Sequence, residues 1–294
     1  MKDFFSHYGW IIVAGALITL TLMYTNPMTE AVGTQEMTMG DLLADKTMEM
    51  AGLKLAEPII DGTNITLSTD VNGNGKVDKG DTLTFATSYL YSGSNTGPTE
   101  FLVLNTNGSD VELLATENYQ TSKFNTSSVT TTDDAGKTVQ KYEGSTLDTL
   151  LNTTYYNSLS STVQSKIKTK SITQNTWQVT TGTLDNPDAT VTGLNSTTYK
   201  YKKTGVVGSY NRKVYALDVV DVKNYLGDTF TGAQVNKMFF GTEEGVSQYV
   251  WLRSAYYGSD NYAFYVFGYF GYLSRSGTYG NDNEARPAFT ITLN

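Results

Sequence analysis

The sequence predicts an α+β domain that follows an apolar N-terminal helix. Three features support this fold class. Residues 4–24 form one apolar run, the chain from residue 61 onward alternates short β-like runs with turn residues, and residues 145–170 place apolar side chains at helical spacing. Strands mixed with a few separated helices favour an α+β domain over a parallel α/β sheet.

The apolar run at residues 4–24 is long enough to cross a bilayer as a helix, which requires about twenty apolar residues. Lys2 precedes the run and acidic residues follow it, which favours an N-terminus inside the cell. We therefore expect residues 1–30 to anchor the protein in the membrane, with the C-terminal domain outside at the cell surface. A cleaved signal peptide and a buried core helix are the alternatives, although no small-residue cleavage site follows the run.

The next segment, residues 31–60, is expected to be a stalk or linker helix. It places five apolar residues at loosely helical spacing: Met37, Leu42, Leu43, Met48 and Leu53. An apolar N-terminal helix followed by a β-rich head is also the plan of pilin-like subunits. The sequence has no prepilin cleavage motif, so a pilin-like subunit remains only an alternative.

The rest of the chain, residues 61–294, is expected to form one domain. Asn107-Gly108 stands between two β-like runs and predicts a hairpin turn. Residues 145–170 predict one or two helices that begin at Ser145 as N-cap. Residues 213–227 begin like a strand and end like a short helix, whereas residues 171–211 are polar and predict long loops with edge strands.

Composition excludes several classes of function. The chain has no cysteine, and its only histidine is His7, so it cannot build thiolate metal sites or a serine–histidine triad. A net charge of −8 argues against nucleic acid as a partner. The acidic residues Asp218, Asp221, Glu243 and Glu244 show no spacing typical of a catalytic pair, so we do not expect an enzyme.

Residues 70–81 resemble the calcium loop of EF-hands and dockerins. Oxygen-bearing side chains stand at loop positions 1, 3, 5, 9 and 12, and glycine stands at position 6. A structural calcium ion would be held by the loop residues Asp70, Asn72, Asn74, Lys76, Asp78 and Asp81. The flanking segments look like strands, and position 12 is aspartate instead of glutamate. An Asn/Gly-rich turn between two strands is therefore the alternative, and no cofactor is required.

The most informative segment is residues 255–284, where seven of thirty residues are Tyr and three are Phe. Small polar residues and glycine make up much of the remainder. Tyrosine with Ser, Gly and Asn is typical of binding loops, because tyrosine offers a large contact area at low entropic cost. Tyrosines that line a twisted sheet are the alternative interpretation.

This segment is flanked by residues 250–254, VWLRS, and residues 285–289, ARPAF. The bracket resembles the variable proteins of diversity-generating retroelements, and the resemblance covers residues 75–294. The resemblance implies a C-type lectin-like fold. It also implies a coding repeat that is rewritten with adenine-directed errors, which turn asparagine AAC codons into many others but never into those of Lys, Glu, Gln, Met or Trp. Residues 255–283 contain none of these five residue types. Glu284-Ala285 departs from the family, which usually has glycine and valine there.

A period-2 interpretation separates scaffold from displayed residues within this region. Phe264, Val266 and Leu273 would be fixed scaffold, and residues 268–271 would form a turn. Trp251, Arg253, Arg286 and Phe289 would be structural anchors, with the guanidinium groups bonded to carbonyls or carboxylates. The residues expected to be displayed and diversified are Tyr256, Tyr257, Ser259, Asp260, Tyr262, Tyr265, Phe267, Tyr269, Phe270, Tyr272, Ser274, Arg275, Ser276, Tyr279, Asn281 and Asp282.

The sequence therefore predicts a surface-displayed, hypervariable ligand-binding protein. Its exposed aromatic side chains would bind a protein or glycan target on another cell, a virus or a surface. An invariant adhesin or carbohydrate-binding surface protein is one alternative, and a pilin-like structural subunit is another.

Overall fold

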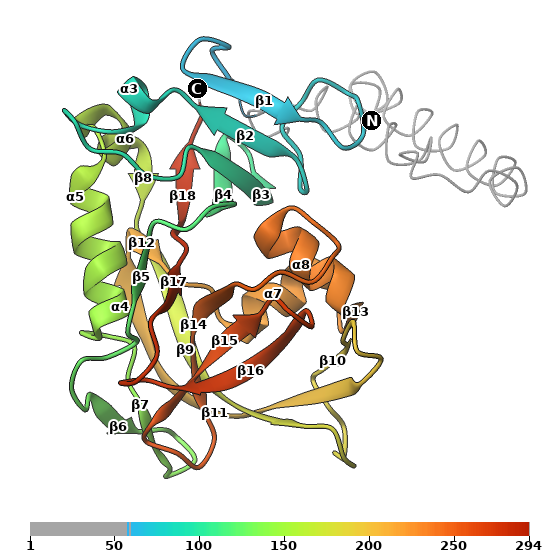
Figure 1. The fold of residues 1–294 in the computed structure, drawn as a ribbon. Coiled ribbons are helices and arrows are strands. Elements are labelled where there is room, and N and C mark those ends of the chain that lie inside the picture. The colour runs from blue at the N-terminus through green and yellow to red at the C-terminus, as the bar shows by residue number, and fades with distance from the viewer. Residues whose placement is uncertain (1–57, 59, 294) are drawn as a thin grey trace, which may run out of the picture. The chain divides into compact units, whose positions relative to one another are not determined.

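Two β-sheets dominate the computed structural model, which describes residues 58 and 60–293 (Figure 1). Strands contain 42% of these residues and helices only 17%. The expected α+β, C-type lectin-like fold is therefore wrong: the described chain is mostly β. The expected membrane anchor at residues 1–30 and the stalk up to residue 57 lie outside the described residues. Within the described part, no helix is sufficiently long and apolar to span a bilayer.

The first sheet joins the beginning of the described chain to its end, and its strands pair antiparallel. Its strands, in spatial order, are β1 (Ile65–Thr69), β2 (Thr82–Phe85), β3 (Glu100–Asn107), β4 (Asp110–Ala115), β18 (Ala288–Thr292) and β12 (Val214–Tyr215), with β8 (Ile167–Lys168) also paired to β18. The predicted hairpin is confirmed: Asn107 pairs with Asp110, and Gly108 takes a left-handed φ of 61° that glycine adopts without strain.

The second sheet carries the region of interest, and β16 lies at one end of it. Its strands, in spatial order, are β13 (Thr229–Thr231), β10 (Ala189–Thr192), β11 (Thr198–Arg212), β9 (Lys170–Thr180), β14 (Tyr249–Tyr256), β15 (Tyr262–Phe267) and β16 (Tyr272–Gly277), with β17 (Asn283–Ala285) paired to β14 and to β5 (Gln120–Ser122). A separate small hairpin joins β6 (Thr130–Thr132) to β7 (Thr138–Gln140).

The fold class was wrong chiefly because residues 171–211 are not loops. They contribute β9 and β11, two long strands that pair along almost their whole length inside the second sheet. β9 contains three Thr together with Ile, Trp and Val, and β11 contains three Tyr, three Lys, two Thr and two Val. β-Branched and aromatic residues favour strands, and Lys and Thr side chains are tolerated on a partly exposed sheet surface. The polarity of residues 171–211 was therefore not sufficient evidence for loops.

The helices are short, as their bounds show: α3 (Thr87–Leu90), α4 (Thr146–Thr149), the π-helical turn η2 (Leu150–Tyr155), α5 (Tyr156–Ser158), α6 (Ser161–Lys166), α7 (Val219–Leu226) and α8 (Gly232–Phe240). The Ser145 side chain accepts a hydrogen bond from the Asp148 N–H, so the predicted N-cap is confirmed. Residues 213–227 begin with strand β12 and end with helix α7, also as predicted. In Figure 1, α4 to α6 run along one side of the sheets, and α7 and α8 lie beside β14 and β15.

Candidate ligand-binding surface

Buried and accessible side chains alternate in β15 from Phe264 to Phe267 and in β16 from Tyr272 to Ser274, whereas β14 is buried from Val250 to Ala255. Phe264 and Val266 of β15 and Leu273 of β16 are fully buried on one face, at 0% exposure. Tyr265 and Phe267 point to the opposite face of β15 and are half-buried. Residues 268–271 form the connecting turn. The predicted scaffold and turn are confirmed.

All sixteen residues expected to be displayed are half-buried or exposed. The structure divides them among an aromatic group on the outer face of the sheet, an arginine–tyrosine group at the far end of the hairpin, and a polar group in the adjoining loops. Each group is described in turn below.

The aromatic group forms a continuous surface, here called the aromatic face. It comprises Tyr249, Tyr265, Phe267, Tyr269, Phe270 and Tyr272, and Phe267 lies at its centre. The Phe267 ring stacks on Tyr249 with 5.3 Å between centroids and meets Tyr272 edge-on, also at 5.3 Å. Tyr269 and Tyr249 are 56% and 36% exposed, so the rings present apolar area to solvent. Offset and edge-on ring pairs hold such a surface in a defined shape.

The turn that carries Tyr269 and Phe270 is fixed by close backbone packing. Gly271 has φ of 62°, and a Cβ there would lie 2.2 Å from the Gly232 carbonyl oxygen. The Asn236 amide donates to the carbonyl oxygens of Gly268 and Glu244 over 2.8 and 2.7 Å. The aromatic side chains therefore extend from a rigid support, although they themselves are accessible.

The arginine–tyrosine group lies at the other end of the hairpin. The Arg275 guanidinium carbon lies 4.2 Å from the centroid of the Tyr256 ring and 5.6 Å from that of Tyr262. Tyr257, the next residue after β14, has the Lys137 ammonium 5.7 Å from its ring centroid. Both arrangements are cation–π contacts, which are favourable at an accessible surface.

The polar group occupies the loops on either side of the hairpin. Asn281 donates to the Ser276 hydroxyl over 2.7 Å, and Ser259 accepts from the Asn261 N–H over 3.2 Å. Gln140 of β7 donates to the Tyr279 hydroxyl over 2.9 Å and to the Asp260 carbonyl. The remaining members of the set are Ser274, which faces Tyr265 across the strand pair, and Asp282, which is exposed.

The four residues predicted as anchors are all buried. Trp251 and Phe289 are 1% and 0% exposed, and the Trp251 indole donates to the Ser122 carbonyl over 2.7 Å. Arg286 pairs with Glu284 over 2.9 Å and also donates to the carbonyl oxygens of Thr116 and Phe239. These anchors of the sequence bracket are therefore part of the core.

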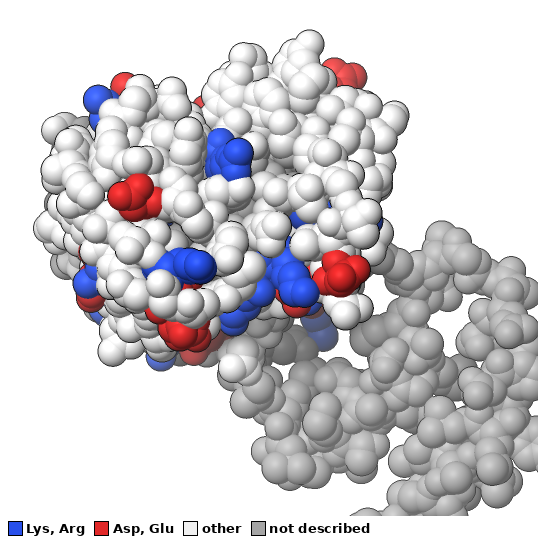
Figure 2. All heavy atoms as spheres, turned by 90° about the horizontal axis from the view of Figure 1, so that it is seen from below, with Lys and Arg blue, Asp and Glu red and all other residues white. Residues whose placement is uncertain are grey.

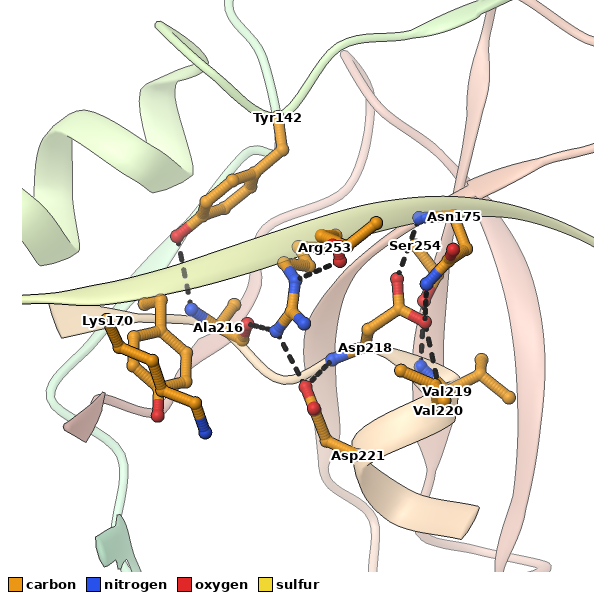
Figure 3. A network of polar contacts seen from close by, with 12 residues as sticks. Tyr142, Lys170, Asn175, Ala216, Asp218, Val219, Val220, Asp221, Arg253 and Ser254 are labelled. Atoms are coloured by element: carbon orange, nitrogen blue, oxygen red, sulfur yellow. Dashed lines mark hydrogen bonds and ion pairs between the residues drawn. The ribbon is translucent and has the colours of Figure 1, made fainter. Parts of the chain in front are cut away.

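Arg253 lies in a buried polar network between β9, α7 and β14 (Figure 3). Its guanidinium donates to the carbonyl oxygens of Thr173 and Ala216 over 2.9 and 2.6 Å, and to the Asp221 carboxylate over 2.7 Å. Burial disfavours its charge, but the carboxylates of Asp221 and Asp218 outweigh that effect and raise the pKa of Arg253. The predicted role as a fork to carbonyls and a carboxylate is confirmed.

Asp218 completes this network. Its carboxylate accepts several hydrogen bonds and is therefore not free for chemistry. It accepts from the Asn175 N–H and side-chain amide, from the Trp177 indole and from the Val220 N–H, over 3.0 to 3.2 Å. Figure 3 shows the bonds from Asn175 and Val220 converging on this carboxylate. Asp218 also caps α7, with Asp221 completing the capping box. Of the other two acids considered for catalysis, Glu243 pairs with Lys237 at the surface over 3.3 Å, and Glu244 accepts through its carbonyl from Asn236.

The calcium-like loop connects β1 to β2, strands as expected from the flanking sequence. Asp70 accepts from the N–H groups of Gly73 and Gly75, each over 2.7 Å, and the hydrogen bond from Gly75 lowers the pKa of Asp70. Asp81 is buried and accepts from the Val71 and Asp78 N–H groups over 2.8 and 2.7 Å. Asn72 and Asn74 both donate to the Asp78 carboxylate. Lys76 donates its backbone N–H to Asn74.

This loop therefore brings its carboxylates together, but their oxygens already accept protein hydrogen bonds. Among the described residues, no group of three or more acidic or histidine side chains is placed to hold a metal ion. Calcium remains a prediction.

Two residues that sequence reasoning missed belong to this region. Tyr249 lies two residues before Trp251, outside the bracket, and the same period-2 alternation could have placed it on the aromatic face. Tyr199 of β11 stacks on Tyr272 with 3.9 Å between centroids and 9° between planes. Its segment was expected to be loop, so the sequence held no signal for this contact.

Comparison with known proteins gives a family for the larger part of the chain. No curated protein and no solved structure matches it. Residues 109–293 match the family model described as a domain of unknown function, DUF6273. This match covers both the predicted variable region and the bracket that flanks it. The chain belongs to the DUF6273 family.

Proposed function

We propose that this protein binds other molecules through the aromatic face, and that the exposed residues of the β14–β16 region are diversified by a retroelement. The observation that carries the proposal is the alternation in this region. Scaffold side chains such as Phe264 and Leu273 are fully buried, whereas all sixteen predicted positions are accessible. Substitution at accessible positions costs little stability, so such a surface can change while the fold persists.

The chemistry of the aromatic face suits recognition. Monomeric proteins rarely expose a large contiguous apolar patch without a partner. Tyrosine is enriched among residues that dominate binding energy, and its hydroxyl adds a hydrogen-bonding group at the rim of each ring. The target is a protein or a glycan on another cell, a virus or a surface, and anchoring through residues 1–30 would display the binding domain outside the cell.

The proposal of diversification rests on the flanking residues 250–254 and 285–289, and on the absence of Lys, Glu, Gln, Met and Trp from residues 255–283. The burial of Trp251, Arg253, Arg286 and Phe289 supports it, because a conserved frame around a variable segment must hold the fold. The mostly β architecture does not weaken this argument, since the argument depends on accessible positions within one strand hairpin.

Sequencing the coding region for residues 250–289 in related isolates tests the proposal. We expect substitutions at adenine-containing codons of the sixteen positions, unchanged codons for Phe264, Val266 and Leu273, and a nearby reverse-transcriptase gene with an imperfect copy of the repeat. An invariant segment, or substitutions spread evenly over buried and accessible positions, would instead favour an invariant adhesin.

A further inference from the structure

Arg275 differs from the other arginines in its interactions. The chain has four arginines, and Arg212, Arg253 and Arg286 each form an ion pair, with Asp148, Asp221 and Glu284. Within residues 60–293, Arg275 makes the two ring contacts described above but no hydrogen bond or ion pair. The guanidinium lies over the Tyr256 ring, and its N–H donors remain for another group.

Arg275 lines a small notch at the end of β16. The notch has a volume of about 210 Å³ and is formed by Val179 and Thr180 of β9, Thr181, Tyr199 of β11, and Tyr272, Ser274 and Arg275 of β16. Five of these seven side chains carry a hydroxyl, and Arg275 carries the only charge among them. Complete small-molecule sites usually occupy about 300–1,000 Å³, so this notch suits one residue of a larger ligand.

A second hollow, lined partly by the same strand, is basic, although the chain as a whole has a net charge of −8. Gln178 of β9 lines this hollow, which contains Lys137, Lys202 and Lys203 but a single aspartate, Asp185. Figure 2, a view from below, shows basic and acidic side chains interspersed on that side of the molecule. A local excess of positive charge attracts anionic ligands.

We infer that the notch binds a carboxylated sugar residue of a glycan target, an inference that rests on the proposed function and narrows its ligand class. A guanidinium held flat by a ring presents paired N–H donors that match a carboxylate. Thr180 accepts from the Gly182 N–H over 3.0 Å but keeps its hydroxyl hydrogen as a donor, and the hydroxyls of Thr181 and Ser274 also line the notch. These groups can bond to sugar hydroxyls, whereas an acidic peptide side chain needs only the arginine, so the notch favours the sugar. The aromatic face continues from Tyr272 and would contact the neighbouring part of the target.

The test is an NMR titration of the full domain with methyl glucuronide, with methyl glucoside as the neutral counterpart and N-acetylaspartate amide as the peptide counterpart. We expect at least tenfold tighter binding of the glucuronide than of either counterpart, with shifts at Ser274 and Thr180. Arg275→Gln should remove this preference. Lys237→Gln, which removes the same charge from an exposed site on α8, should leave it within twofold.

Three results would overturn the inference: no binding of the glucuronide, equal binding to the Arg275→Gln variant, or equal or tighter binding of the aspartate amide. The last result would assign the notch to an acidic peptide. None of them bears on the pattern of codon substitutions, so failure of this inference is distinguishable from failure of the proposed function.

Discussion

The hydroxyl of Tyr201 donates to the Leu273 carbonyl over 2.8 Å and accepts from the Leu273 N–H over 3.1 Å. Tyr201 belongs to β11 and Leu273 to β16, strands that are not neighbours in the second sheet. One buried side chain from the scaffold therefore satisfies both backbone groups of a residue in the end strand. This strand carries Tyr272, Ser274, Arg275 and Ser276, so Tyr201 positions the hairpin of β15 and β16.

Replacing Tyr201 by Phe should destabilise the protein by about 1–3 kcal/mol, because it leaves buried Leu273 backbone groups without partners. Urea unfolding followed by circular dichroism measures this loss. Tyr199→Phe is the matched control: the Tyr199 hydroxyl accepts from the exposed Asn195 amide over 3.2 Å, and its loss should cost under about 0.5 kcal/mol. Equal losses in the two variants would show that the Tyr201 hydroxyl has no special role.

Neighbouring positions of the hairpin should differ sharply in their effect on stability. Phe264→Ala should cost about 3–5 kcal/mol, since the ring is fully buried between Tyr201 and Tyr256. Tyr269→Ala should change stability by less than about 0.5 kcal/mol, since Tyr269 is 56% exposed. Thermal unfolding of both variants provides the measurement. A large loss for Tyr269→Ala would mean that the aromatic face is part of the core, and the proposed binding surface would then be wrong.

The candidate surface was easier to predict from sequence than the fold. The alternation at residues 262–267 reflects a single strand with one buried face, which is a local property, so Phe264 and Tyr265 could be assigned without knowing the rest. The strand pair β9–β11 depends on partners far along the chain. Its Lys and Thr residues look like loop residues until the neighbouring strands are known, and this hid both Tyr199 and Tyr201.

The roles of the buried polar residues also could not be predicted from the sequence. Asp218 and Asp221 could be read as candidate acids or as surface charges, and they are neither. Their role depends on Arg253, Asn175 and Trp177, which come from two other strands. No spacing in the sequence indicates a network assembled from three separated segments.

Alkaline pH should unfold the protein through its buried tyrosines. Burial raises the pKa of Tyr142, Tyr155, Tyr201 and Tyr215 above the ordinary value of 10.0. Above pH 10.0 these phenols stay protonated in the folded state while the unfolded chain loses protons. The folded state then binds more protons, so the free energy of unfolding falls as pH rises. Phenolate absorbance should rise in two phases, the second coinciding with loss of the circular dichroism signal. Complete ionisation with unchanged circular dichroism would contradict this expectation.

Calcium should stabilise the protein through the loop at residues 70–81. Burial raises the pKa of Asp81, and the nearby carboxylates of Asp70 and Asp78 raise it further. For an acid with a raised folded pKa, stability is lost as pH rises from the ordinary value of 3.8 through the folded value. At neutral pH the loop therefore holds carboxylates that repel one another, and a divalent cation would relieve this repulsion.

We expect calcium at 100 times its Kd to add about 2.7 kcal/mol of stability at pH 7. Melting curves with calcium and with a chelator measure the difference. Asp78→Asn should remove most of the calcium effect, because it removes a carboxylate that now accepts from Asn72 and Asn74. Lys123→Gln, a substitution in another segment, should leave the effect intact. Identical melting curves for the unmodified protein in both solutions would show that residues 70–81 are a turn between β1 and β2 and hold no ion.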